Sequence, residues 1–175
     1  MKYLCTAFDV AVYIKTANFP IKQEYGILES IWERREELLA AKYKAEKKQF
    51  LNLIRHEMNK LDGSLDYVDE INYILKEMGS KYLLCDQEFE QDVIASYFKV
   101  IKIQLLLTPG KKYCRIKLRT IIRSFGYKRR TASLVEYMNK TINALGLKTY
   151  VRGLERCNIR DVSLDQVIIV RLKNM

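Results

Sequence analysis

Residues that interrupt regular backbone structure are rare in this chain. The 175 residues include only two prolines and seven glycines, so most of the sequence can form long uninterrupted elements, mainly helices. One proline and one glycine stand together in Thr108-Pro109-Gly110, which ends a helix because the residue before proline is pushed out of helical backbone. We therefore expect long helices before residue 110 and shorter elements after it.

The net charge changes at the same place. The chain as a whole carries +10. Residues 111–175 hold sixteen lysines and arginines against four acidic residues, whereas residues 1–110 hold fifteen against seventeen. Positive charge confined to one segment points to a polyanionic partner rather than to a general compositional bias. We predict a helical domain over residues 1–109, for self-association or partner binding, and a basic nucleic-acid-binding domain over residues 110–175.

The sequence lacks the common signatures of metal, membrane and secreted proteins. The four cysteines stand far apart without a CxxC pair, and the single histidine, His56, has no cysteine near it, so no zinc site or other cofactor is expected. No run approaches the roughly 20 apolar residues of a membrane span, and the N-terminus does not resemble a signal peptide. We expect a cytoplasmic protein with reduced thiols and no membrane partner.

Before residue 110 the apolar pattern is mostly helical. Residues 2–6 fit a short strand, and residues 8–14 fit a short helix or a strand. A helical pattern runs from about residue 24 to 61, with a polar middle that is either a break or a stretch of helix outside the core. Further helices are expected over residues 64–78 and from Asp86 to about Leu107.

After residue 110 the elements become short and their order is informative. Gly126 and Gly146 follow apolar helical patterns, as glycines that end helices do, and Thr131 is a natural N-cap. The expected order is strand, helix, helix, strand, strand, over residues 112–116, 117–125, 132–145, 147–151 and 166–172.

This order predicts a winged helix-turn-helix, so the fold class is mainly α with an α+β C-terminal domain. Two helices joined by a short turn with glycine are the helix-turn-helix signal, and the second helix enters the DNA major groove by its N-terminus. Its free N–H groups would face phosphate. The predicted DNA contacts come from the turn, this helix and the wing: Lys128, Arg129, Arg130, Thr131, Ser133, Tyr137, Lys140, Arg152, Arg156 and Arg160.

The segment IKLRTIIRSFGYKRRTASLVEYMNKTINALGL resembles the winged-helix modules of restriction-associated and mobile-element proteins. In those modules a helix ending in Phe-Gly is followed by paired arginines and a second helix ending in Gly-Leu. The resemblance covers about residues 112–172. It implies a non-enzymatic protein that binds duplex DNA in a bacterial defence, phage or mobile-element system.

Three other functions stay open at this stage. An adaptor would use residues 1–109 for partners and the basic segment for an acidic protein. A Mg²⁺-dependent nuclease would use Asp66, Asp69 and Glu70, which share a helix face, although the chain has no Gly-rich phosphate loop and no Ser/His/Asp set. An RNA-binding protein would stack unpaired bases on the tyrosines of the basic segment, Tyr113, Tyr127, Tyr137 and Tyr150.

Overall fold

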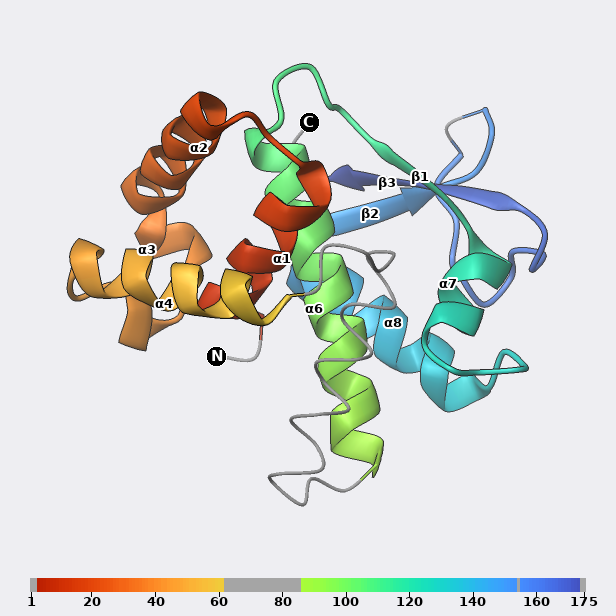
Figure 1. Cartoon of the computed structure of the whole chain (residues 1–175). Helices are drawn as coiled ribbons and strands as arrows, with labels where there is room; N and C mark the ends of the chain where they lie inside the picture. The colour runs from red at the N-terminus through yellow and green to blue at the C-terminus, as the bar shows by residue number, and fades with distance from the viewer. Residues whose placement is uncertain (1–2, 62–85, 154, 174–175) are drawn as a thin grey trace. The chain divides into compact units, whose positions relative to one another are not determined.

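A computed structural model describes residues 3–61, 86–153 and 155–173 of this chain. These residues are mainly helical, with one small antiparallel sheet of three strands (Figure 1). The chain divides into two compact units, residues 1–83 and residues 84–175. The division falls between residues 83 and 84 rather than after residue 109, where the charge shift placed it.

The described residues of the first unit form a series of helices. The pattern over residues 24–61 forms separate helices, and its polar middle is a break, with Glu46 in extended backbone. Residues 8–14 are helical, and only Cys5 of the predicted first strand pairs, in a single parallel bridge with Leu39. The predicted helix over residues 64–78 lies outside the described residues. The helices are α1 (Ala7–Ala17), α2 (Ile21–Glu33), α3 (Arg35–Leu38), the 3₁₀ helix η1 (Ala41–Tyr43) and α4 (Lys47–Lys60).

A capping box lies at the N-terminus of helix α1. The backbone N–H and hydroxyl of Thr6 donate to the carboxylate of Asp9 at 2.8 and 3.0 Å, and the Asp9 N–H donates back to the Thr6 hydroxyl at 3.3 Å. These bonds satisfy groups at the start of α1 that the helix itself leaves without partners. Helix α1 packs against α4. Tyr13 and Phe50 are among the fully buried side chains.

The second unit follows the predicted order closely. The long helix before Pro109 belongs to this unit because it packs against a helix and a strand of the basic segment. The observed bounds lie within two residues of the predicted ones, and Gly126 and Gly146 have φ of 80° and 70°, as expected for helix-ending glycines. The elements are α6 (Asp86–Leu107), β1 (Cys114–Lys117), α7 (Leu118–Ser124), α8 (Ala132–Ala144), β2 (Leu147–Tyr150) and β3 (Val167–Leu172).

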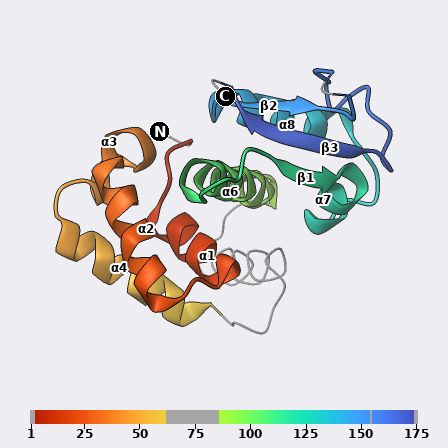
Figure 2. The same ribbon diagram turned by 90° about the horizontal axis from the view of Figure 1, so that it is seen from above.

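The sheet places the last strand between the other two. Its order is β1-β3-β2, and both pairs are antiparallel. Arg115 pairs with Ile169, which also pairs with Tyr150. Helix α8 packs against β2 and helix α6 against β3, and Figure 2 shows α8 lying along the sheet. The helices therefore cover the face that carries the buried side chains Ile168 and Val170.

The connection from β2 to β3, residues 151–166, first turns back along the edge of β2. The turn contains Gly153, with φ of 96°, and is closed by a hydrogen bond of 3.0 Å from the Val151 N–H to the Glu155 carbonyl. Cys157 then pairs with Thr149 through its N–H, at 3.0 Å, and its carbonyl accepts from the Thr149 hydroxyl at 2.8 Å. This return covers the free edge of β2.

Candidate nucleic-acid interface

The start of α8 presents a concentration of positive charge. The Thr131 hydroxyl accepts a hydrogen bond of 3.2 Å from the Leu134 N–H, which confirms Thr131 as the N-cap. The first N–H groups of a helix have no partner within it, and the helix dipole is positive at this end. Lys128 and Arg129 precede the cap and are exposed. An anion at this end of α8 would meet both the helix terminus and these two side chains.

Arg130 points inward instead. Its side chain is half-buried, and its Nη1 atom donates to the carbonyl oxygens of Ile159, at 3.1 Å, and Val162. Both carbonyls belong to the β2–β3 connection, and both apolar side chains are buried. Arg130 therefore ties the connection to the start of α8. Its predicted contact with DNA stays a prediction.

A cavity of about 220 Å³ lies between the first half of α8 and the β2–β3 connection. Asn139 donates from Nδ2 to Oδ1 of Asn158 at 2.8 Å, and the same oxygen accepts from the Arg160 N–H at 2.9 Å. These bonds hold the turn that carries Arg160 against the helix. The residues that line this cavity are Ala132, Val135, Glu136, Asn139, Asn158 and Arg160.

A second cavity, of about 360 Å³, continues along the same side of α8. Asn139 and Asn158 line both cavities, so the two are adjacent, and together they are called here the α8 groove. Of its lining residues, Lys148, Arg156 and Arg160 are basic and Glu136 is acidic. The second cavity is lined by Asn139, Ile142, Asn143, Lys148, Thr149, Arg156, Cys157 and Asn158.

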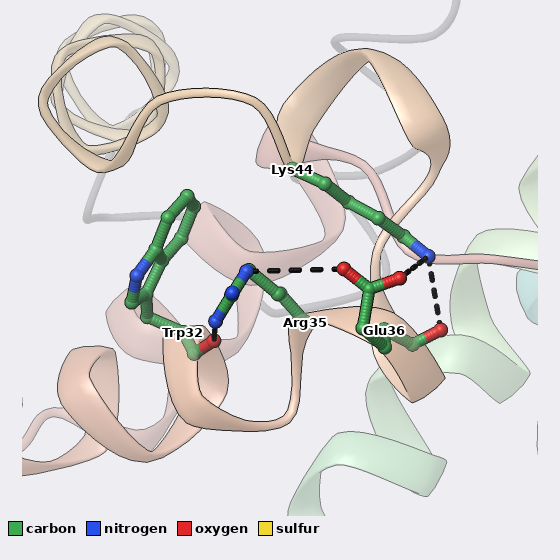
Figure 3. Close-up of polar contacts among 4 residues, drawn as sticks. All are labelled: Trp32, Arg35, Glu36 and Lys44. Atoms are coloured by element: carbon green, nitrogen blue, oxygen red, sulfur yellow. Dashed lines mark hydrogen bonds and ion pairs between the residues drawn. The ribbon is translucent and has the colours of Figure 1, made fainter.

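Five cations in the described part of the first unit, by contrast, are paired with neighbouring carboxylates. Figure 3 shows one cluster, in which Lys44 pairs with the Glu36 carboxylate at 3.0 Å and also donates to the Glu36 carbonyl at 2.9 Å. Arg35 lies 3.8 Å from the same carboxylate, donates to the Trp32 carbonyl at 3.2 Å, and stacks on the indole ring. Further pairs are Arg34–Glu37, Lys47–Glu29 and Lys60–Glu57.

In the described part of the second unit, the Asp165 carboxylate accepts the ion pairs. Asp165 binds Arg119 through two hydrogen bonds, of 2.9 and 2.6 Å, and lies 3.4 Å from Lys117. The hydrogen bond from Arg119 is the main reason that the pKa of Asp165 falls from 3.8 to about 2. Among the residues that the structure describes, Lys128, Arg129 and Arg160 make no ion pair.

The structure brings most of the predicted contact residues to the solvent. Arg130 and Tyr137 are half-buried; exposed are Lys128, Arg129, Thr131, Ser133, Lys140, Arg152, Arg156 and Arg160. Sequence reasoning missed Asn139, Asn143, Lys148 and Asn158 of the groove. The spacing of Asn139 and Asn143, four residues apart on one helix, could have signalled a shared face. No local signal identifies Lys148 or Asn158.

Among the described residues there is no cluster of three or more side chains able to hold a metal ion, and the acidic set Asp66, Asp69 and Glu70 lies outside them. Burial raises the pKa of the Cys114 and Cys157 thiols, which makes them less reactive. Within the described residues no helix has the length and apolar character needed to cross a bilayer.

Comparison of the chain with protein-family models, with curated proteins and with solved structures finds no match. Function is therefore inferred from the charge and geometry of the second unit. Its two distinguishing features are the unpaired cations at the start of α8 and the groove beside that helix.

Proposed function

We propose that the second unit is a winged helix-turn-helix module that binds duplex DNA, with α8 as the recognition helix. The element order supports this, because helix, strand, two helices and two strands follow one another as such a module requires. Gly126, with positive φ, lies in the turn between α7 and α8. In this proposal the β2–β3 connection is the wing, and α6 is the helix that precedes β1.

The observation that carries the proposal is the convergence of unpaired cations on the N-terminus of α8. Lys128 and Arg129 come from the turn before the helix. Arg160, about thirty residues further along the chain, comes from the wing and is held there by the Arg130 and Asn158 hydrogen bonds. Duplex DNA is a dense linear polyanion, and a helix N-terminus flanked by cations is well suited to its phosphates.

The α8 groove extends the same surface. Lys148, Arg156 and Arg160 line it from the strand and the wing. When the N-terminal part of α8 enters a major groove, these cations lie beside the helix, where they would meet the phosphate backbone. Contacts of this kind fix orientation on the duplex and carry no sequence information by themselves.

The first test is a charge reversal at the start of α8. We expect the double variant Lys128→Glu, Arg129→Glu to bind a mixed-sequence duplex at least about tenfold more weakly, because it removes two phosphate contacts and adds repulsion. The measurement is a mobility shift at low salt. The matched control is Lys22→Glu, Lys48→Glu, which makes the same change of charge on exposed residues of the first unit.

Equal weakening in the two double variants would show that net charge rather than the α8 surface governs binding, and would contradict the proposal. Unchanged affinity in the Lys128, Arg129 variant would do the same. No shift with any nucleic acid, together with retention of an acidic protein partner after nuclease treatment, would favour the adaptor function instead.

A further inference from the structure

The sheet has a second face, directed away from α6 and α8, of which the proposed duplex site uses Lys148 alone. Side chains alternate between the faces of a strand, and the covered face takes Cys114, Ile168 and Val170, which are buried. The alternate residues define what is called here the outer sheet face. They are Tyr113, just before β1, Arg115 and Lys117 on β1, Lys148 and Tyr150 on β2, and Val167, Ile169 and Arg171 on β3.

Aromatic rings and guanidinium groups alternate across this face. The Arg171 guanidinium carbon lies 5.8 Å from the ring centre of Tyr150 and 5.5 Å from that of Tyr113. The Arg115 guanidinium carbon lies 5.3 Å from the same Tyr113 ring. The row therefore runs Tyr150, Arg171, Tyr113, Arg115 from β2 to the start of β1, with cation–π contacts at each step.

The positive charge of this row is not neutralised. No acidic residue belongs to the outer sheet face, and within the described chain neither Arg115 nor Arg171 forms an ion pair. The Arg171 Nε is buried and has no hydrogen-bond partner there, so the rings rather than a carboxylate hold this guanidinium. Tyr113 is nevertheless 40% exposed, a large value for an aromatic side chain.

We propose that the outer sheet face binds single-stranded nucleic acid, with unpaired bases stacked on Tyr113 and Tyr150 and phosphates bound by Arg115, Arg171 and Lys148. Aromatic rings next to unpaired cations are the two components of single-strand recognition; of the two rings here, Tyr113 is exposed and Tyr150 is half-buried. The faces of bases within a duplex are covered by their neighbours, so the rings select an unpaired strand. An acidic protein would use the cations of this face and gain little from its rings.

This inference does not depend on the proposed duplex site. The two surfaces share one residue, Lys148 of β2, which also lines the α8 groove. A protein that bound a single strand on the sheet and no duplex on α8 would satisfy the inference and contradict the proposed function.

The experiment uses the full chain and three labelled probes of equal length: a mixed-sequence single strand, its duplex, and a single strand with abasic sites. We expect Tyr113→Ala to weaken binding of the base-bearing single strand about fivefold or more, since alanine substitution of a stacking residue has effects of this size. Tyr113→Phe keeps the ring and should restore binding. Duplex affinity should stay within about twofold in both variants.

Several outcomes would overturn the inference. One is that Tyr113→Ala weakens single-strand and duplex binding equally. Another is that the wild type binds the abasic and the base-bearing strand with equal affinity. A third is that polyglutamate competes as strongly as the unlabelled strand. Thermal unfolding followed by circular dichroism checks that the variants are folded. Arg115 lies at the β1 end of the row, next to the Tyr113 ring. Arg115→Glu is a second variant that should also weaken single-strand binding.

Discussion

Two arginines of the basic segment are held by groups of different charge, and the difference matters for the field around α8. Arg119 binds the carboxylate of Asp165, so its charge is neutralised nearby. Arg130 donates to two backbone carbonyls, which carry no net charge. Arg130 therefore positions the wing and still adds its full positive charge to the start of α8. A guanidinium with several donors can serve both purposes.

The Asp165 ion pair predicts a pH dependence of stability. Because the pKa of Asp165 is about 2 in the folded protein and near 3.8 otherwise, its contribution to the free energy of unfolding is present above about pH 4 and is lost as the pH falls towards 2. We expect Asp165→Asn to flatten the pH dependence of stability in this window. Urea unfolding of both proteins at about pH 4.5, 3.5 and 2.5 measures the pH dependence of the free energy of unfolding.

An Asp165 carboxyl that titrates near pH 4 in an NMR experiment on the folded protein would contradict this prediction. Asp161, an exposed carboxylate of the same connection with no ion pair among the described residues, is the matched control. Asp161→Asn removes one negative charge from the same connection without touching the Arg119 ion pair, so it controls for the change of charge alone.

Among the secondary-structure elements, the β2–β3 connection does most to assemble the candidate interface. It covers the edge of β2, brings Arg156 to the second cavity and places Arg160 beside the start of α8. Its attachment to α8 consists of the Arg130 hydrogen bonds and the Asn139–Asn158 pair. Loss of this attachment would separate the cations of the wing from those of the turn.

Arg130→Ala tests the attachment. We expect it to lower the free energy of unfolding by about 1.5–3 kcal/mol. Hydrogen bonds from a charged group are lost, and the carbonyls of Ile159 and Val162 lose their donor. Urea unfolding provides the measurement. The neighbouring Arg129→Ala removes an exposed side chain and should change stability by less than about 0.5 kcal/mol. Equal stability of the two variants would mean that Arg130 does not hold the wing.

In the molecule as a whole, the two units differ in how far their cations are paired with carboxylates. The first unit pairs cations such as Lys44 and Lys47 with nearby glutamates, while the second concentrates unpaired cations around α8 and on the outer sheet face. Binding of DNA by such a protein releases counterions from the phosphates, so the affinity depends steeply on salt. The cations expected to meet duplex DNA are Lys128, Arg129, Lys140, Lys148, Arg152, Arg156 and Arg160.

This distribution predicts the salt dependence of duplex binding. If these side chains neutralise roughly five to seven phosphates, the slope of log K against log salt concentration is roughly −4 to −6. A salt titration by fluorescence anisotropy measures it. Lys128→Gln should reduce the magnitude of the slope by about one, whereas Lys22→Gln should leave it unchanged. A wild-type slope near zero would exclude a phosphate-binding surface of this size.

The sequence by itself determined the elements of the second unit and the location of its charge. The apolar spacing of Leu118, Ile121 and Ile122, the positive-φ position of Gly126 and the cap at Thr131 are local features, because helix periodicity and capping depend on residues within a few positions of one another. The break between α2 and α4 was left open, since a polar stretch fits a helix outside the core as well as a loop.

Only the tertiary structure decided how these elements are used. It grouped α6 with the basic segment, turned Arg130 inward onto Ile159 and Val162, and formed the α8 groove around Asn139 and Asn158. Each of these contacts joins residues that are many positions apart. Local periodicity carries no information about where the chain returns, and the return is set by the packing of buried side chains across the whole unit.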